Sequence, residues 1–254
     1  MIPKKLHYCW FSGEPFPESI QRCIDSWHKF LPNFEWVKWD YDKAKALDIP
    51  WVNKALVQKN WAFAADAVRL YALYTEGGLY LDTDVEVLRS FEPMLDQPYI
   101  LGYENGSDRI EAATMGCEAG FSPMKVALDF YKNQEFNYSE NVVDQMVLPN
   151  ILRESFKDFK DLKILPESAF SPKSFIDGKI RATKDSFSIH HFSSSWRPES
   201  VRKGIARRQM LFAKFPRPIA KALSIPLALW TNLQALGILG TLQKLKALFK
   251  QPKN

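Results

Sequence analysis

The stretch that most constrains the fold runs from Trp61 to Asp84. Its first part has small and apolar residues at spacings of three and four, the period of a helix with one buried face. These residues are Ala62, Ala65, Val68, Ala72 and Leu73. Gly77 and Gly78 end the helix, because glycine adopts the left-handed conformation that helix C-termini commonly need. We therefore expect a helix, a sharp break and a short buried strand over residues 79–85.

Two carboxylates come at the end of this expected strand. Asp82 and Asp84 are two residues apart, so on extended backbone their side chains point the same way. Converging carboxylates repel each other unless a cation lies between them, and such hard oxygen ligands suit Mn²⁺ or Mg²⁺. An exposed turn with two solvated aspartates is the alternative for an isolated D-x-D. Here the pair ends an apolar strand that follows a helix and a Gly-Gly break, and this context favours the metal site. Asp66 and Arg69 lie at i and i+3 on that helix, so their side chains project from one face.

The rest of the first half alternates between strand and helix patterns. Strands are expected over residues 4–10 and 35–40 with a helix over 17–31 between them, an order that predicts parallel pairing through a right-handed crossover. The patterns further on predict strands and one helix; these are strands over 98–103, 112–117 and 161–165, and a helix over 123–132. The whole is the pattern of an α/β protein.

Near the end of this region, residues 186–192 alternate as a strand and carry two adjacent histidines. Ile189 and His191 face one way, and Ser188 and His190 the other. A histidine on a strand is more often structural than a ligand, but imidazole also binds Mn²⁺ and can complete a shell begun by carboxylates.

Three motifs in order carry a family resemblance. The first is IPKKLHYCWFSG at residues 2–13, the second is AFAADAVRLYALYTEGGLYLDTD at residues 62–84, and the third is HHFSSSW at residues 190–196. Together they resemble the D-x-D sugar-binding region and the flanking motifs of glycosyltransferase family 32, which includes mannosyltransferases and capsular polysaccharide transferases. The catalytic cores of clostridial glucosylating toxins are similar.

This resemblance implies a GT-A-type fold, α/β with a central mixed sheet. It implies a metal-dependent, retaining hexosyltransferase that uses a nucleotide diphosphate sugar, with a UDP-sugar favoured. The acceptor would be a glycan or lipid-linked saccharide in bacterial surface polysaccharide synthesis. Asp66 would accept hydrogen bonds from the sugar, and Arg69 would either donate to the diphosphate or hold Asp66 in place. Asp82 and Asp84 would position the metal-bound diphosphate, Asp84 more directly.

The resemblance also supplies further binding residues. His191 would complete the metal shell, because its spacing to Trp196 is the better match, and the role of His190 stays open. Residues contacting the nucleotide sugar would include those already named in the helix and the D-x-D, together with Tyr8, Trp10, Thr83, Ser194 and Trp196.

The last part of the chain differs in composition. Residues 199–254 contain eleven Lys and Arg and one acidic residue, a net charge of about +10, which leaves 23 basic and 28 acidic residues over 1–198. We expect a catalytic domain over 1–198 and a basic amphipathic helical extension over 199–254. The extension would lie on an anionic membrane surface; the alternative is a helical cap on the core. No recognisable motif indicates nucleic acid.

Composition also bears on location and on alternative functions. Three scattered cysteines fit a reducing compartment, and no signal peptide is evident, so we expect a cytoplasmic protein peripheral to the inner face of the cell membrane. Paired aspartates could also serve a metal-dependent phosphohydrolase or nucleotidyltransferase, which the three-motif pattern makes a minor alternative. A non-catalytic scaffold attached to the membrane through the basic extension is the other alternative.

Overall fold

The computed structural model describes residues 1–137, 146–194 and 197–250, with no side chains described at 235–236, 239 and 243–250. It divides into two compact units. The first contains residues 1–137, 147–173 and 180–192. The second contains residues 174–179, the segment ending at Met146 and the chain from Ser193 onward.

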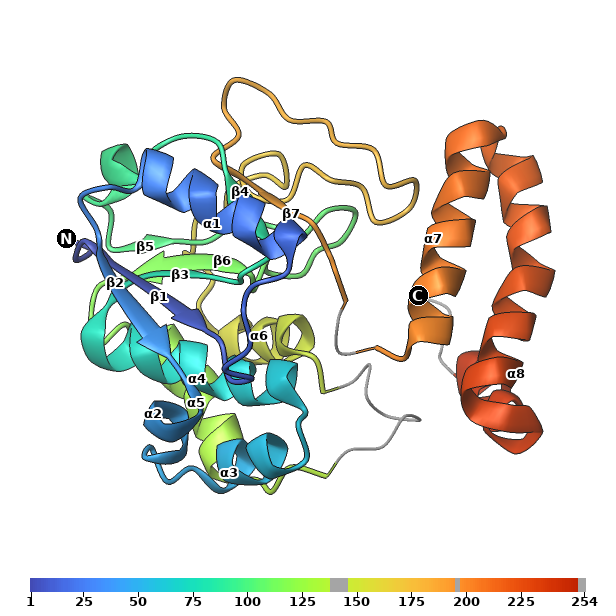
Figure 1. The fold of residues 1–254 in the computed structure, drawn as a ribbon, viewed down its shortest axis with the longest axis horizontal. Coiled ribbons are helices and arrows are strands. Elements are labelled where there is room, and N and C mark those ends of the chain that lie inside the picture. Colours follow the sequence, from blue (N-terminus) through green and yellow to red (C-terminus); the bar gives the residue numbers. More distant parts are fainter. Residues whose placement is uncertain (138–145, 195–196, 251–254) are drawn as a thin grey trace. The chain divides into compact units, whose positions relative to one another are not determined.

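The first unit is built on a five-stranded mixed sheet (Figure 1). Its strands, in spatial order, are β2 (Glu35–Trp39), β1 (Lys5–Cys9), β3 (Gly78–Leu81), β6 (Thr114–Cys117) and β5 (Tyr99–Ile100). β2, β1 and β3 are parallel, whereas β6 and β5 each run antiparallel to their neighbour. The expected α/β class, the central mixed sheet and the parallel pairing of the first two strands are confirmed.

Helices cover both faces of this sheet (Figure 1). On one face, α1 (Glu18–Phe30) buries Ile20, Ile24 and Trp27 in a core that also contains apolar residues of β1 and β3. On the other face, α4 (Trp61–Glu76) packs against β1, β3 and β6. Around α4 lie the remaining helices of the unit: α2 (Tyr41–Lys45), α3 (Pro50–Val57), α5 (Ser122–Lys132) and α6 (Leu148–Phe156). A short 3₁₀ helix, η1, spans Glu92–Met94.

The glycine pair after α4 lies where two chain segments approach closely. Gly77 has φ 66° and Gly78 has φ 107°. A Cβ at Gly78 would lie 2.7 Å from the backbone oxygen of Lys5, and one at Gly77 would lie 2.7 Å from the backbone nitrogen of Ala119. The pair therefore lets β3 begin directly beside β1.

The expected strand over residues 79–85 is divided in the structure. β3 ends at Leu81, and a turn closed by a 2.9 Å hydrogen bond from Val85 N–H to Asp82 C=O leads into β4 (Val85–Val87). β4 pairs antiparallel with β7 (Ser188–His190) in a separate two-stranded sheet. Two further strand expectations were too long. Only residues 99–100 of 98–103 form a strand, and 161–165 contributes a single bridge from Leu165 to Gly102.

The second unit is dominated by two long helices, α7 (Glu199–Lys214) and α8 (Arg217–Lys250). They pack on each other, and Gly204 of α7 sits so close to Thr231 of α8 that a Cβ would lie 2.5 Å from the threonine hydroxyl. The helical path of α8 is broken at Gly237, which has φ 67°. Over the described residues, no helix has both the length and the apolar character required to cross a membrane.

Candidate active site

A buried arginine joins the helix to the D-x-D segment. Nη2 of Arg69 lies 3.1 Å from Oδ1 of Asp66 and 3.1 Å from Oδ1 of Asp82. Nη1 donates to Oδ2 of Asp82 at 3.2 Å and to the carbonyl of Ala112 at 2.7 Å, and Nε donates to the carbonyl of Ala65 at 3.4 Å. Hydrogen bonds and ion pairs thus engage all three guanidinium nitrogens, so Arg69 holds the two carboxylates together.

The environment of these two carboxylates disfavours their charged forms. Burial raises the pKa of Asp66 to about 7, in spite of the opposing charge of Arg69. Burial also raises the pKa of Asp82, again against the charge of Arg69. Tyr80 donates its hydroxyl to Oδ1 of Asp82 at 3.0 Å, which fixes that carboxylate further.

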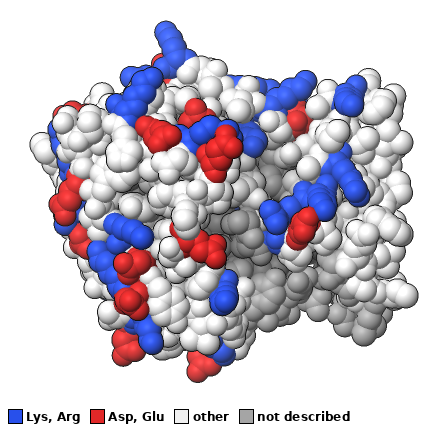
Figure 2. Space-filling view, in the orientation of Figure 1, with Lys and Arg blue, Asp and Glu red and all other residues white. Residues whose placement is uncertain are grey.

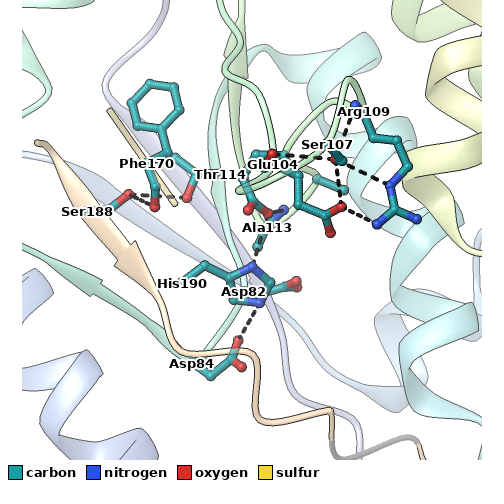
Figure 3. Close-up of polar contacts among 12 residues, drawn as sticks. Asp82, Asp84, Glu104, Ser107, Arg109, Ala113, Thr114, Phe170, Ser188 and His190 are labelled. Carbon is teal, nitrogen blue, oxygen red and sulfur yellow. Dashed lines mark hydrogen bonds and ion pairs between the residues drawn. The ribbon is translucent and has the colours of Figure 1, made fainter. Parts of the chain in front are cut away.

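The second sheet brings a histidine to the D-x-D segment. In the β4–β7 register, His190 lies opposite Val85, the residue after Asp84. Nε2 of His190 is 3.6 Å from Oδ1 of Asp84 (Figure 3). One ligand atom each from Asp82, Asp84 and His190 falls within 4.8 Å of the others. The two aspartates therefore converge as expected, but through a turn and not on extended backbone.

A glutamate lies on the opposite side of the imidazole ring. Nδ1 of His190 lies 3.1 Å from Oε1 of Glu111, and the same oxygen accepts the backbone N–H of Ala113 at 2.9 Å. The Glu111 side chain is 1% exposed, so its position is set by the protein interior. With Nδ1–H donated to Glu111, Nε2 is the ring nitrogen directed at the aspartates.

These groups form a strongly acidic environment around one imidazole. Burial lowers the pKa of His190, but the charges of Glu111 and Asp84 outweigh it and raise the pKa to about 9. Conversely, burial opposes ionisation of Glu111, but the charge of His190 holds its pKa below the usual range. Burial and the charge of Glu111 raise the pKa of Glu104, which pairs with Arg109 at 2.5 Å (Figure 3).

His191 does not lie with the aspartates. Its Nε2 lies 2.9 Å from Oε2 of Glu86 on β4, while its backbone N–H donates to the carbonyl of Asp84 at 3.1 Å. The reason is the alternation of side chains along β7: Ser188 contacts Thr114 of the central sheet at 3.4 Å, and His190 shares that face. The structure thus places His190 where we expected His191.

The other expected binding residues have varied surroundings. Tyr8 packs edge-on to Trp27 and Trp36, and the indole N–H of Trp10 donates to the carbonyl of Glu14 at 2.7 Å. Thr83 is half-buried in the turn between the two aspartates. Ser194 belongs to the second unit, and Trp196 lies outside the described residues. Contacts of these residues with a nucleotide sugar stay predictions.

His7, in the first sequence motif, is hydrogen-bonded to the segments on either side of its strand. The indole N–H of Trp39 donates to its Nδ1 at 3.3 Å, which leaves Nε2 to donate to the carbonyl of Gly77 at 2.9 Å. The ring is fully buried, and that burial lowers its pKa, so it is a neutral structural histidine. It ties β1 to the glycine break ahead of β3.

The cluster fits a divalent cation. Two carboxylates and an imidazole suit Mn²⁺ and related ions, and a metal-binding histidine typically donates its other ring N–H to a carboxylate, as His190 does to Glu111. A bound cation would also offset the acidic charge gathered around His190. Sequence reasoning left the role of His190 open and did not select Glu111, which orients His190 from outside the cluster.

Comparison with known proteins found matches to the part of the chain that contains the D-x-D segment. Residues 17–101 match the family model described as a glycosyltransferase sugar-binding region containing a DXD motif. The matched range includes Asp66, Arg69, Asp82 and Asp84, so this part of the chain carries a DXD-type sugar-binding region.

Two curated fungal proteins are similar over this region. Inositol phosphoceramide mannosyltransferase 3 of Schizosaccharomyces pombe is 34% identical over 105 residues, covering 38% of this chain and 28% of that protein. Glucan organizing enzyme 1 of Cryptococcus neoformans is 40% identical over 55 residues, covering 22% of this chain and 15% of that protein. The chain thus spans less than a third of either relative. Among solved structures, PaToxG glycosyltransferase aligns with a TM-score of 0.48 and 16% identity, over 62% of this chain and 70% of that one.

Proposed function

We propose that this protein is a metal-dependent glycosyltransferase of GT-A type. It would move a hexosyl unit from a nucleotide diphosphate sugar, with a UDP-sugar favoured, to a glycan or lipid-linked acceptor in surface polysaccharide synthesis. We base this on one observation: the Asp82–Asp84–His190 cluster stands inside and beside the segment that matches the DXD sugar-binding model. One matched relative is a mannosyltransferase by its name, which is compatible with a hexosyl donor.

In this proposal, Asp82, Asp84 and His190 hold a divalent ion, Mn²⁺ or Mg²⁺, that neutralises the charge developing on the departing diphosphate. Glu111 orients His190 by accepting its Nδ1–H. Trp10 and Thr83 follow the C-terminal ends of β1 and β3, which are adjacent parallel strands, so both residues are placed to contact the donor in this proposal. Ligands of parallel strands gather at the carboxyl ends of those strands, where these residues are found.

In this proposal, Asp66 and Arg69 have separate roles in donor binding. Asp66 accepts hydrogen bonds from hydroxyls of the donor sugar and orients it. Arg69 acts as a positioning residue, because its donors are already engaged by Asp66, Asp82 and two backbone carbonyls. A direct contact of Arg69 with the diphosphate would compete with these ion pairs and hydrogen bonds, so holding Asp66 in place is the role we favour.

We propose retention of the anomeric configuration by a front-face reaction. The departing phosphate would accept the proton of the acceptor hydroxyl as the new bond forms on the same face of the sugar. The stereochemistry of the product tests this step separately, because an inverted product would contradict it.

The test of the proposed function combines binding and turnover. UDP- and GDP-sugars, each with Mn²⁺ or with EDTA, are added to wild type, Asp84→Asn and the surface control Asp96→Asn. A ligand that binds the native state raises the melting temperature by mass action. We expect a Mn²⁺-dependent rise with one nucleotide class in wild type and in Asp96→Asn, absent in Asp84→Asn, together with release of the matching nucleoside diphosphate.

Two other outcomes would contradict the proposed glycosyltransferase activity. Release of inorganic phosphate or pyrophosphate without a glycosidic product would favour a phosphohydrolase or nucleotidyltransferase. If no nucleotide sugar raises the melting temperature under any condition, the glycosyltransferase proposal fails.

A further inference from the structure

The two helices of the second unit form an antiparallel hairpin with a defined internal face. The connection between α7 and α8 is only two residues long, so the helices run in opposite directions side by side (Figure 1). On α7 the contact includes Gly204, which is buried against Thr231. On α8 the buried residues of the first turns are Ala220 and Ser224, which share one side of the helix with Thr231. These residues define the line along which the hairpin is packed.

A row of large apolar side chains on α8 lies away from this line. Ile219, Leu223, Trp230 and Leu233 are spaced by four, seven and three residues, so they share one side of the helix. Their exposed fractions are 49%, 44%, 56% and 41%. At about 100° per residue, this row lies roughly a third of a turn before the packing line, counted in the direction in which the helix winds from its N-terminus. Four adjacent large apolar residues exceed the scattered apolar exposure that is normal on a protein surface.

A row of basic side chains occupies the corresponding side of α7. Lys203, Arg207 and Lys214 are spaced by four and seven residues, all exposed, with exposed Met210 between them. This row also precedes the packing line of its own helix by roughly a quarter turn. Since the helices run in opposite directions, two rows displaced in the same rotational sense lie on the same side of the hairpin. Figure 2 shows this side, with Lys and Arg over α7, acidic atoms beside them, and uncharged residues over α8. Lys203 pairs with Glu199 at 2.7 Å.

We propose that this face of the hairpin binds an anionic lipid surface. The occupant is chosen by charge: a basic row parallel to an apolar row matches the anionic headgroups and acyl boundary of a leaflet, and eleven Lys and Arg against one acidic residue after Pro198 extend that match. Trp230 would sit at the headgroup level, where an indole ring has its apolar body buried and its N–H hydrated. The proposal does not depend on the glycosyltransferase activity.

The test is sedimentation of the full chain with vesicles at low and physiological salt. Vesicles of phosphatidylcholine alone are compared with vesicles containing one-third phosphatidylglycerol. We expect binding only to the anionic vesicles, weakened by salt because exposed charges are screened within about 8–10 Å. The triple variant Lys203→Glu/Arg207→Glu/Lys214→Glu should bind at least about a hundredfold more weakly, at roughly fivefold for each basic residue. Leu223→Ser/Trp230→Ser should also weaken binding.

Matched controls carry the same changes elsewhere. Lys38→Glu/Lys45→Glu/Lys132→Glu reverses three exposed charges of the first unit, and Val57→Ser/Val126→Ser removes two exposed apolar side chains there. Each of these controls should bind anionic vesicles within about threefold of wild type, since neither change touches the hairpin face. Circular dichroism and melting temperature confirm that each variant is folded.

Three results would overturn the proposal. The first is no sedimentation of wild type with anionic vesicles at low salt. The second is equal binding by wild type and both hairpin variants. The third is a stable dimer, measured by light scattering, that Leu223→Ser/Trp230→Ser dissociates, which would assign the face to a second copy of the chain.

Discussion

Nδ1 of His190 lies 3.1 Å from Oε1 of Glu111, a carboxylate 79 residues earlier in the chain. This contact fixes the imidazole ring so that Nε2 points toward Asp84. It also links the two sheets of the first unit, because His190 belongs to β7 and Glu111 precedes β6 of the central sheet. The geometry of the candidate metal-binding cluster of Asp82, Asp84 and His190 is therefore set in part by Glu111, a residue outside the cluster.

Replacing Glu111 by Gln tests this positioning role. Gln has nearly the same shape but no charge, so it holds the ring less firmly and no longer stabilises its proton. We expect Mn²⁺ affinity, measured from free Mn²⁺ by electron paramagnetic resonance, to fall about 10–100-fold. The pKa of His190, followed by NMR, should fall as well, which a purely structural role would not produce. Glu118→Gln, at a partly exposed position, is the control. An Mn²⁺ affinity of Glu111→Gln equal to that of the control would contradict the positioning role.

The two histidines can be separated by substitution. His190→Ala removes a cluster member and should abolish the Mn²⁺-dependent rise in melting temperature. His191→Ala breaks only a partly exposed pair with Glu86, worth no more than about 1 kcal/mol, and should leave the Mn²⁺ effect intact. Thermal unfolding of both variants with Mn²⁺ and with EDTA distinguishes them. Loss of the Mn²⁺ effect in His191→Ala alone would restore the assignment made from the sequence.

The raised pKa of His190 makes metal binding depend on pH. Below a pKa of about 9 the ring is protonated in the metal-free protein, so the ion must displace a proton to reach Nε2. Mn²⁺ affinity should therefore rise by up to tenfold per pH unit toward pH 9 and level off above it. Calorimetry in two buffers of different ionisation enthalpy should detect release of about one proton at pH 7.5. His190→Ala should show neither effect.

Much of the fold was predictable because its signals are local. The helix at 61–76, the break at Gly77 and Gly78, and the first parallel strand pair follow from periodicity and backbone freedom within a few residues. The prediction of one continuous strand over 79–85 was wrong, because a turn separates β3 from β4. Apolar content there does not distinguish one strand from two strands joined by a turn, and the Asp82–Val85 hydrogen bond decides it.

The candidate site was predictable only where its members are close in sequence. Asp66, Arg69, Asp82 and Asp84 fall within one motif, whereas Glu111 has no local pattern that separates it from a surface glutamate. For the histidines, alternation predicted that His190 and His191 face opposite ways. Which of those faces turns toward the D-x-D depends on the pairing of β7 with β4, a long-range contact that periodicity does not contain.

Gly78 should tolerate no side chain. In Gly78→Ala the Cβ would approach the backbone oxygen of Lys5 to 2.7 Å at φ 107°, so overpacking adds to the cost of a left-handed residue. We expect a loss of roughly 2–5 kcal/mol in the free energy of unfolding, measured in urea. Gly120→Ala is the matched control: φ is also positive, at 80°, but the new methyl meets nothing within 4 Å, so only about 1–2 kcal/mol should be lost. Similar losses in both variants would contradict the close approach.

Arg69 should be essential to stability because two carboxylates share it. In Arg69→Leu, Asp66 and Asp82 remain buried without their cation, and breaking such a buried pair typically costs roughly 3–5 kcal/mol. Urea unfolding at pH 7 measures this loss. Arg22→Leu, which removes only an exposed helix pair with Glu18, should change the free energy of unfolding by less than about 1 kcal/mol.

The pH dependence of that loss identifies its cause. Burial already raises the pKa of Asp66 to about 7 with Arg69 in place, and removing the arginine's charge raises it further. Above about pH 7 wild type has released this proton, whereas the native state of Arg69→Leu keeps it up to its higher pKa, so the stability of the variant goes on falling as pH rises. The deficit of Arg69→Leu relative to wild type should therefore widen between pH 7 and pH 9, and Asp66→Asn in the same background should reduce it at pH 9. A deficit that is equal at pH 7 and pH 9 would mean that lost packing, and not stranded charge, accounts for the instability.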